Sequence, residues 1–201
     1  MKKRDWVVPA AFAACCLPAL WFVVQFLRGG LSANPVDDVL NGMGYWAFVL
    51  LALTLACTPL SLILKLKWPL RIRKLLGDFS FTYACLHLAS YVGLDQGLDF
   101  SAIGQDILKH KFIMLGMATW LLLLPLAVTS TQGWQKRLGF RRWKRLHRVV
   151  YVAGVLASIH FFLRFKTARI ETIAWGALVA ALLLVRVVDA LRKRAPVIQS
   201  S

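Results

Sequence analysis

The sequence has few acidic residues and few cysteines, and each shortage narrows the class of protein. Only nine of its 201 residues are Asp or Glu, whereas 59% are hydrophobic. A chain with so little polar surface cannot cover a water-soluble globule, so it belongs in a bilayer. The four cysteines lie within apolar segments and show no CxxC spacing, so we expect small packing residues without structural disulfides. No glycine-rich dinucleotide fingerprint follows a strand, so this chain is not expected to bind NAD(P)H.

Long apolar runs are what the sequence does have. A helix needs about 20 apolar residues to cross roughly 30 Å of hydrocarbon. Six runs qualify, of which the fifth is short: 6–27, 44–64, 75–94, 112–129, 149–163 and 170–191. Arg186 and Asp189 interrupt the sixth run, and their spacing of three residues predicts an ion pair. We therefore predict an all-α integral membrane protein, a bundle of six transmembrane helices. It forms a single domain over residues 1–201, because no loop could fold separately.

The excess of basic residues predicts the orientation. Lys and Arg gather in four segments that fall on one side of a six-span chain: 2–4, 65–74, 136–148 and 192–194. The positive-inside rule makes that side the cytoplasm, with both termini inside. Arg164, Lys166 and Arg169 form a basic exception on the outer side. The net charge of +16 then reflects topology and attraction to membrane lipid. Nucleic-acid binding is not expected, because the basic segments are short connectors at the bilayer surface.

Two of the four histidines lie deep within predicted spans. His87 is 12 residues from the inner end of span 75–94, and His160 is 11 residues from that of span 149–163. These separations put both rings at similar depth, about 18 and 16 Å along helices that run in the same direction. Ionisable groups at membrane depth are costly and usually functional. A single buried histidine is usually a hydrogen-bonded core residue. Two imidazoles at the same depth favour a bis-histidine haem site.

His147 cannot belong to that same site. It lies 13 residues before His160, which places it about 19 Å lower and about 220° around an ideal helix. A second haem nearer the cytoplasm is its natural role, and the partner ligand is expected near Arg73 or Lys74, where the sequence has no histidine. A solvated side chain at the membrane surface is the alternative.

Three further residues near these histidines have simpler interpretations. Tyr83 and Tyr91 lie four residues on either side of His87, where packing is favoured over a hydrogen bond to a haem propionate. His110 stands between two lysines on the outer side and is expected to be a loop residue.

The segments around the histidines resemble one known family. They read RKLLG at 73–77, FTYACLHLASY at 81–91, LPLAVTS at 124–130, WKRLHRVVY at 143–151 and IHF at 159–161. They resemble the MsrQ (YedZ) family, the haem-binding membrane subunits of the periplasmic methionine sulfoxide reductase system, which belongs to the ferric-reductase-like transmembrane group. The likeness runs through nearly the whole chain, including the layout of six spans.

The resemblance implies cofactors, partners and a location. Proteins of this family bind one or two b-type haems, are associated with FMN and lie in the bacterial inner membrane. They carry electrons from the quinone pool or a cytosolic flavin reductase to a periplasmic molybdopterin-containing (MsrP-like) subunit, which reduces methionine sulfoxide in proteins. The positions here that match the family's haem residues are His87, His147 and His160.

Imidazoles on both axial positions leave iron no open site, which suits one-electron transfer. The basic inner loops 66–74 and 134–143 could attract a flavin phosphate or an acidic donor. The main rival is a six-span transporter or proton channel that uses His87 and His160 as a proton relay. The spans lack Asp and Glu until Asp189, which weighs against that rival. A purely structural membrane anchor would leave the matched histidines unexplained.

Overall fold

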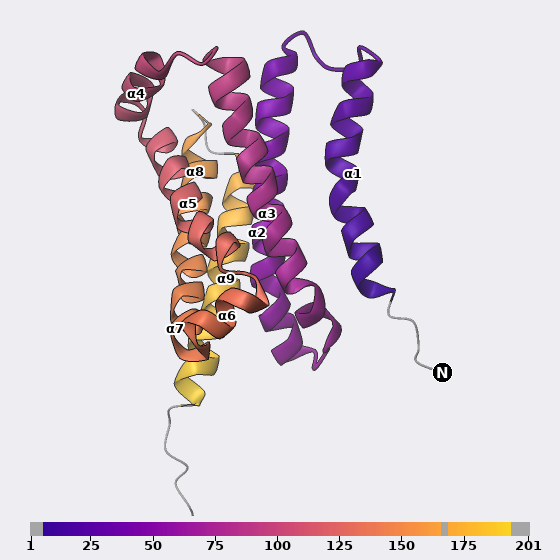
Figure 1. Ribbon diagram of the computed structural model, residues 1–201, viewed down its shortest axis with the longest axis vertical. Coiled ribbons are helices and arrows are strands. Elements are labelled where there is room, and N and C mark those ends of the chain that lie inside the picture. Colours follow the sequence, from indigo (N-terminus) through magenta and orange to yellow (C-terminus); the bar gives the residue numbers. More distant parts are fainter. Residues whose placement is uncertain (1–5, 166–168, 194–201) are drawn as a thin grey trace, which may run out of the picture.

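The computed structural model describes residues 6–165 and 169–193, and every regular element within them is a helix (Figure 1). The long helices are α1 (Val7–Leu27), α2 (Pro35–Ile63), α3 (Trp68–Ser90), α5 (Lys111–Val128), α8 (Val150–Leu163) and α9 (Ile170–Arg192). The short elements are the π-helical turn η1 (Tyr91–Asp95), α4 (Phe100–Lys109), α6 (Gln132–Leu138), α7 (Phe140–Leu146) and the 3-10 turn η2 (His147–Val149). The predicted all-α fold is confirmed. Of the predicted basic clusters, residues 2–4, 166 and 194 lie outside the described residues.

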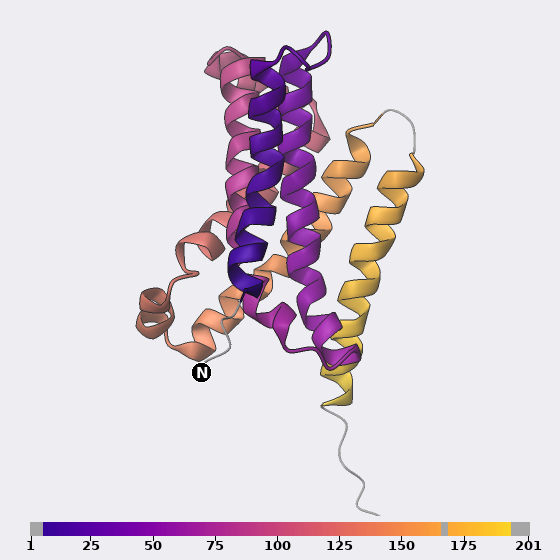
Figure 2. The same cartoon turned by 90° about the vertical axis from the view of Figure 1, so that its right-hand side faces the viewer.

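Five stretches of the described chain are long and apolar enough to cross a bilayer: α1, α2, α5, α9 and the run Phe140–Leu163, which joins α7, η2 and α8. α3 is long enough but too polar, because its first half carries four charged residues, Arg71, Arg73, Lys74 and Asp78. It nevertheless packs along α2 within the bundle (Figures 1 and 2). The chain is therefore a multi-pass membrane protein. A sixth span and the cytoplasmic side of both termini stay predictions.

The helices pack in pairs, α2 with α3 and α5 with α8, while α9 contacts α8 and α2 (Figure 2). The core between α2, α8 and α9 is aromatic and aliphatic, and Phe48 stacks on Phe161 with ring centres 5.1 Å apart. Small residues let α8 approach α2 closely. Ala153 is fully buried, and a Cβ added to Gly154 would lie 2.8 Å from Leu55 Cδ1. Close packing of this kind replaces the hydrophobic effect between helices in lipid.

One tyrosine fastens α1 to the bundle. The Tyr83 hydroxyl of α3 donates to the Cys15 carbonyl at 2.8 Å and accepts from the Ala19 amide at 2.9 Å. These two backbone groups are four residues apart and would otherwise bond each other. Pro18 lies in the same turn, and the phenol occupies the opened hydrogen bond. Tyr83 is buried in the core cluster, so it packs as predicted, and its hydroxyl in addition bonds the backbone of α1.

The two ends of the bundle differ in charge. The end that carries α4, at the top of Figure 1, includes Asp95, Asp99 and Asp106. The opposite end carries α6 and α7, which together hold six Lys and Arg and no acidic residue. α1 begins and α9 ends at this basic end (Figure 1). The arrangement agrees with the charge pattern from which the orientation was predicted.

Candidate functional site

The bundle holds two cavities stacked along its length. The upper cavity, of about 660 Å³, lies between α2, α3, α5 and α8 at the end that carries α4. Its wall is mainly apolar, and its volume falls within the range of about 300–1,000 Å³ common for cofactor sites. His87 from α3 and His160 from α8 both line it. His87 and His160, which were predicted to lie at the same depth, thus line the same cavity.

Both of these imidazoles are held in the tautomer that a metal ligand needs. His87 Nδ1 lies 2.8 Å from the Leu40 carbonyl of α2, and His160 Nδ1 lies 2.6 Å from the Phe112 carbonyl of α5. Because a carbonyl oxygen can only accept, Nδ1 must carry the proton in each ring. Nε2 is then left with its lone pair. This second-sphere hydrogen bond is the usual way in which a metal-binding histidine is oriented.

The separation of the rings fits one metal between them. The ring centres are 6.2 Å apart, with an angle of 69° between the planes. An imidazole nitrogen lies about 1.2 Å from its ring centre and about 2 Å from a bound metal, so two rings on opposite sides of one metal have centres about 6.4 Å apart. The two imidazoles are therefore spaced as two ligands of one haem iron would be. In the described part of the chain, no group of three His, Cys, Asp or Glu offers another kind of metal site.

A cation lines the same cavity one helical turn beyond His160. The Arg164 guanidinium stacks on the ring of Phe165 at 4.8 Å, and in the described chain no carboxylate lies within ion-pair distance of it. Burial lowers the pKa of Arg164 from its ordinary value, which means that its charge is poorly solvated there. A propionate is the anion that haem would bring to this position. The spacing of four residues between His160 and Arg164 is a signal that could have found this residue, because residues four apart share a helix face.

A hydrogen-bonded group lies at the mouth of the upper cavity. The Tyr91 hydroxyl donates to Asp106 Oδ2 at 2.7 Å, and His110 Nδ1 lies 2.7 Å from Asp106 Oδ1. His110 stands between α4 and α5 with an exposed side chain, so its predicted place in a connection is confirmed. Tyr91 makes a polar contact with the protein itself rather than only packing.

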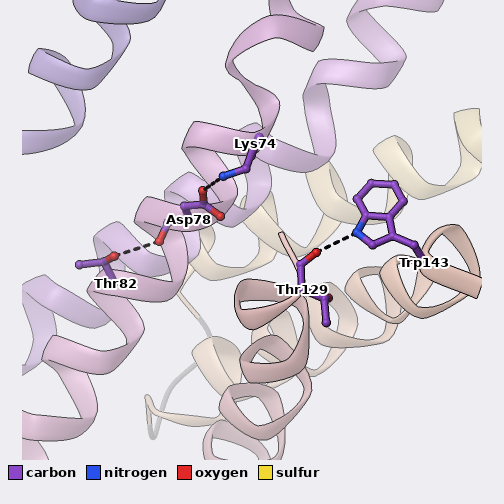
Figure 3. A network of polar contacts seen from close by, with 5 residues as sticks. All are labelled: Lys74, Asp78, Thr82, Thr129 and Trp143. Carbon is purple, nitrogen blue, oxygen red and sulfur yellow. Dashed lines mark hydrogen bonds and ion pairs between the residues drawn. The ribbon is translucent and has the colours of Figure 1, made fainter. Parts of the chain in front are cut away.

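The lower cavity, of about 720 Å³, lies nearer the basic end. It is lined by five cations, Arg73, Lys74, Lys144, Arg148 and Arg186. Among the residues that the structure describes, Asp78 is the only acid in its wall, and Lys74 Nζ lies 2.6 Å from Asp78 Oδ2 (Figure 3). The other four cations have no acidic residue within the lining. Such a cavity suits an anionic group such as a phosphate or a carboxylate.

His147 lines the lower cavity, and no other histidine does. Its ring packs on the Trp143 indole with centres 4.2 Å apart, and that indole donates to the Thr129 carbonyl at 2.9 Å (Figure 3). The Thr129 hydroxyl lies 2.6 Å from the Pro125 carbonyl, to which it donates its proton, so it accepts from His147 Nε2 at 3.1 Å. Nε2 of His147 therefore carries a proton, unlike Nε2 of the upper pair. Arg73 and Lys74 face the same cavity, at the height where a partner was expected.

The predicted ion pair between Arg186 and Asp189 is wrong. Arg186 turns inward and donates to the Tyr151 hydroxyl at 2.9 Å and to the Leu55 carbonyl at 2.7 Å. Asp189 lies 2.7 Å from Lys193 Nζ instead. The cause lies in α2: a helical carbonyl bonds the amide four residues on, and for Leu55 that residue is Pro59, which has no N–H. The arginine satisfies the carbonyl that the proline leaves free.

A thin wall separates the two cavities. Leu51 and Leu123 line both of them. Phe81 of the lower cavity stacks on Trp120 of the upper one, with ring centres 6.0 Å apart. Groups held in the two cavities would be separated by about one layer of side chains.

Comparison with known proteins identifies the family. The family model described as "Ferric reductase like transmembrane component" matches residues 43–158, a range that includes His87 and His147 and ends just before His160. The chain is 46% identical to the protein-methionine-sulfoxide reductase heme-binding subunit MsrQ of Rhodospirillum rubrum, over 96% of this chain and 94% of that protein. It is 43% identical to the MsrQ of Caulobacter vibrioides, over 92% of this chain and 89% of that protein.

Proposed function

This chain belongs to the MsrQ family of ferric-reductase-like transmembrane proteins, and from that premise we propose that it carries electrons through haem b held between His87 and His160. The role of membrane electron transfer follows from the family. The observation that carries the assignment to these residues is the pair of Nε2 atoms left free on rings whose centres are 6.2 Å apart in one apolar cavity. The recipient is a periplasmic molybdopterin-containing subunit that reduces protein methionine sulfoxide.

The orientation required for this task is six spans with both termini in the cytoplasm. α3 is the additional span, because it lies along α2 with His87 at the level of His160. Its charged residues gather in its first half, at the same end as the basic α6 and α7. The upper cavity then lies near the periplasm and the lower cavity near the cytoplasm, in the order that outward electron flow needs.

The protein's own residues would bind the cofactor and shield it. Haem b, when bound, supplies a reversible one-electron carrier at membrane depth. His87 and His160 would hold the iron through their Nε2 atoms, and iron held by two imidazoles suits one-electron transfer better than oxygen binding. The apolar wall excludes water, and Arg164 would neutralise a propionate at the outer end.

The lower cavity is the proposed place of electron entry. Its cations suit the phosphate of FMN or the propionates of a second haem b, which share the chemistry of a bound anion. His147 would lie against that group, close to the donor, which is quinone or a cytosolic flavin reductase. The two occupants are distinguishable: extraction and fluorimetry detect FMN, whereas a pyridine haemochrome assay with two haems per chain indicates the second haem.

An absorption spectrum tests the proposal against its rivals. The protein purified from haem-replete cells should show the bands of a reduced b-type haem after dithionite. It should also reduce a purified periplasmic subunit of the same system when its haem is reduced beforehand. A colourless protein that carries protons or solutes in vesicles would instead support the transporter, and a colourless inactive one would support the structural anchor.

A further inference from the structure

Each histidine of the upper cavity is backed by a glycine of a neighbouring helix. A Cβ added to Gly44 of α2 would lie 2.9 Å from His87 Nδ1 and 3.0 Å from its Cε1. A Cβ added to Gly116 of α5 would lie 2.8 Å from His160 Cε1 and 3.0 Å from its Nδ1. Contacts this short force a shift in the ring or in the helix. At either position, a residue other than glycine would therefore change how the facing imidazole sits against that helix.

The same two glycines give the rings access to their hydrogen-bond acceptors. His87 bonds the carbonyl of Leu40, four residues before Gly44, and His160 bonds that of Phe112, four residues before Gly116. In a helix, the side chain at position i+4 lies beside the carbonyl of residue i, which is why Ser and Thr at i+4 can bond it. Without a side chain at i+4, the second lone pair of the carbonyl is open to a ring from the next helix.

We propose that Gly44 and Gly116 are positioning residues for the haem ligands. Each glycine, with the carbonyl one turn before it, forms a cradle that fixes the plane of one imidazole and keeps the proton on Nδ1. The α2 cradle holds His87 and the α5 cradle holds His160, so two separate pairs of helices use the same device. This inference rests on the proposed function, because it assumes that the rings bind haem.

The effect expected of an added methyl group is on the iron as well as on packing. A shifted ring loses or lengthens its bond to the carbonyl, and loss of such a partner typically weakens metal binding by about 10- to 100-fold. The imidazole also becomes a weaker electron donor, which favours the reduced iron. Gly44→Ala and Gly116→Ala should therefore release haem faster and raise its midpoint potential.

Two other glycines provide matched controls. Gly154 of α8 is as crowded, with a Cβ placed 2.8 Å from Leu55 Cδ1, but it touches no histidine. Gly176 of α9 has nothing within 4 Å of its added Cβ. Gly154→Ala reports the cost of crowding alone, and Gly176→Ala reports the cost of a methyl group in open space.

The test uses the full-length protein in detergent, with three readouts for each variant. These are the rate of haem release to excess apomyoglobin, the midpoint potential and the melting temperature. We expect Gly44→Ala and Gly116→Ala to release haem about 10- to 100-fold faster than the wild type and at a higher potential. Gly154→Ala should lower the melting temperature without moving the potential, and Gly176→Ala should move neither. If Gly44→Ala, Gly116→Ala and Gly154→Ala change haem release, midpoint potential and melting temperature to the same extent, the proposal is wrong.

A second variant covers the case in which Gly44→Ala does not accumulate. Deleting the ring removes the clash, so Gly44→Ala/His87→Ala should accumulate and melt like His87→Ala. If His87→Ala accumulates but Gly44→Ala/His87→Ala does not, the added methyl group causes a general packing defect, and the proposal is wrong. The ligand variants separate the two claims. If His87→Ala and His160→Ala both keep a full low-spin spectrum, the proposed function fails; if they lose it while both glycine variants match Gly154→Ala, only the present inference fails.

Discussion

The contact between Arg186 and the Leu55 carbonyl predicts an energetic coupling between α9 and a proline in α2. Pro59 cannot donate to that carbonyl, and the Arg186 guanidinium does so at 2.7 Å. In the variant Arg186→Met the carbonyl loses its donor. A buried polar group without a partner costs about 1–3 kcal/mol. Pro59→Ala restores an amide at the position that normally bonds this carbonyl, so it should remove most of that cost.

The coupling free energy between Arg186→Met and Pro59→Ala tests the contact more directly than the effect of either substitution alone. Arg186→Met also removes a buried cation whose Nε has no hydrogen-bond partner in the described chain, a change that acts in the opposite direction. That contribution is the same with proline or alanine at position 59 and cancels in a double-mutant cycle. We expect Arg186→Met to cost about 1–3 kcal/mol more beside Pro59 than beside Ala.

Equilibrium unfolding in mixed micelles of increasing SDS content measures the four proteins of the cycle, with matched haem content. The control is Pro125→Ala in α5, another helix-interior proline. Its coupling to Arg186→Met should lie within about 0.5 kcal/mol of zero. A coupling at Pro59 that is no larger than this control would refute the reasoning about the free carbonyl.

Three further predictions concern the cavities and the orientation. His147→Ala should slow electron entry from the cytoplasmic donor while the upper haem keeps its spectrum and its reduction by dithionite; loss of all haem would contradict separate sites. Arg164→Gln should weaken haem retention about tenfold or more, because a charge-assisted bond to a propionate is lost; unchanged haem release to apomyoglobin would oppose that contact. A reporter active only in the periplasm should work when fused after Asp99 and fail after Gln135; activity at the second position would overturn the six-span map.

Counting residues along the predicted spans was enough to predict that His87 and His160 lie close together in the upper cavity. Equal distance from the inner ends of two parallel spans predicted that His87 and His160 lie at one depth, and their ring centres are 6.2 Å apart. The same counting separated His147, which lines the other cavity. Depth is predictable because a helix rises by a fixed amount per residue and the bilayer gives a common origin. The haem roles of the three histidines stay predictions.

Contacts between helices were beyond the sequence pattern. Arg186 was predicted to pair with Asp189 by local spacing, whereas a carbonyl on α2, far away in the chain, holds it. Gly44 and Gly116 gave no signal, because an isolated glycine in a span has many meanings until its neighbour is known. α3 is less apolar than the five stretches long and apolar enough to span, and three of its four charged residues, Arg73, Lys74 and Asp78, line the lower cavity.

The most direct test of the central claim compares the haem spectra of single histidine variants. Electron paramagnetic resonance and absorption of the oxidised protein should show a low-spin haem with two imidazole ligands. Both His87→Ala and His160→Ala should lose that signal or convert it to high spin, while His110→Ala, a histidine at the cavity mouth, should keep it. An unchanged low-spin signal in either of the first two variants would contradict a haem held between His87 and His160.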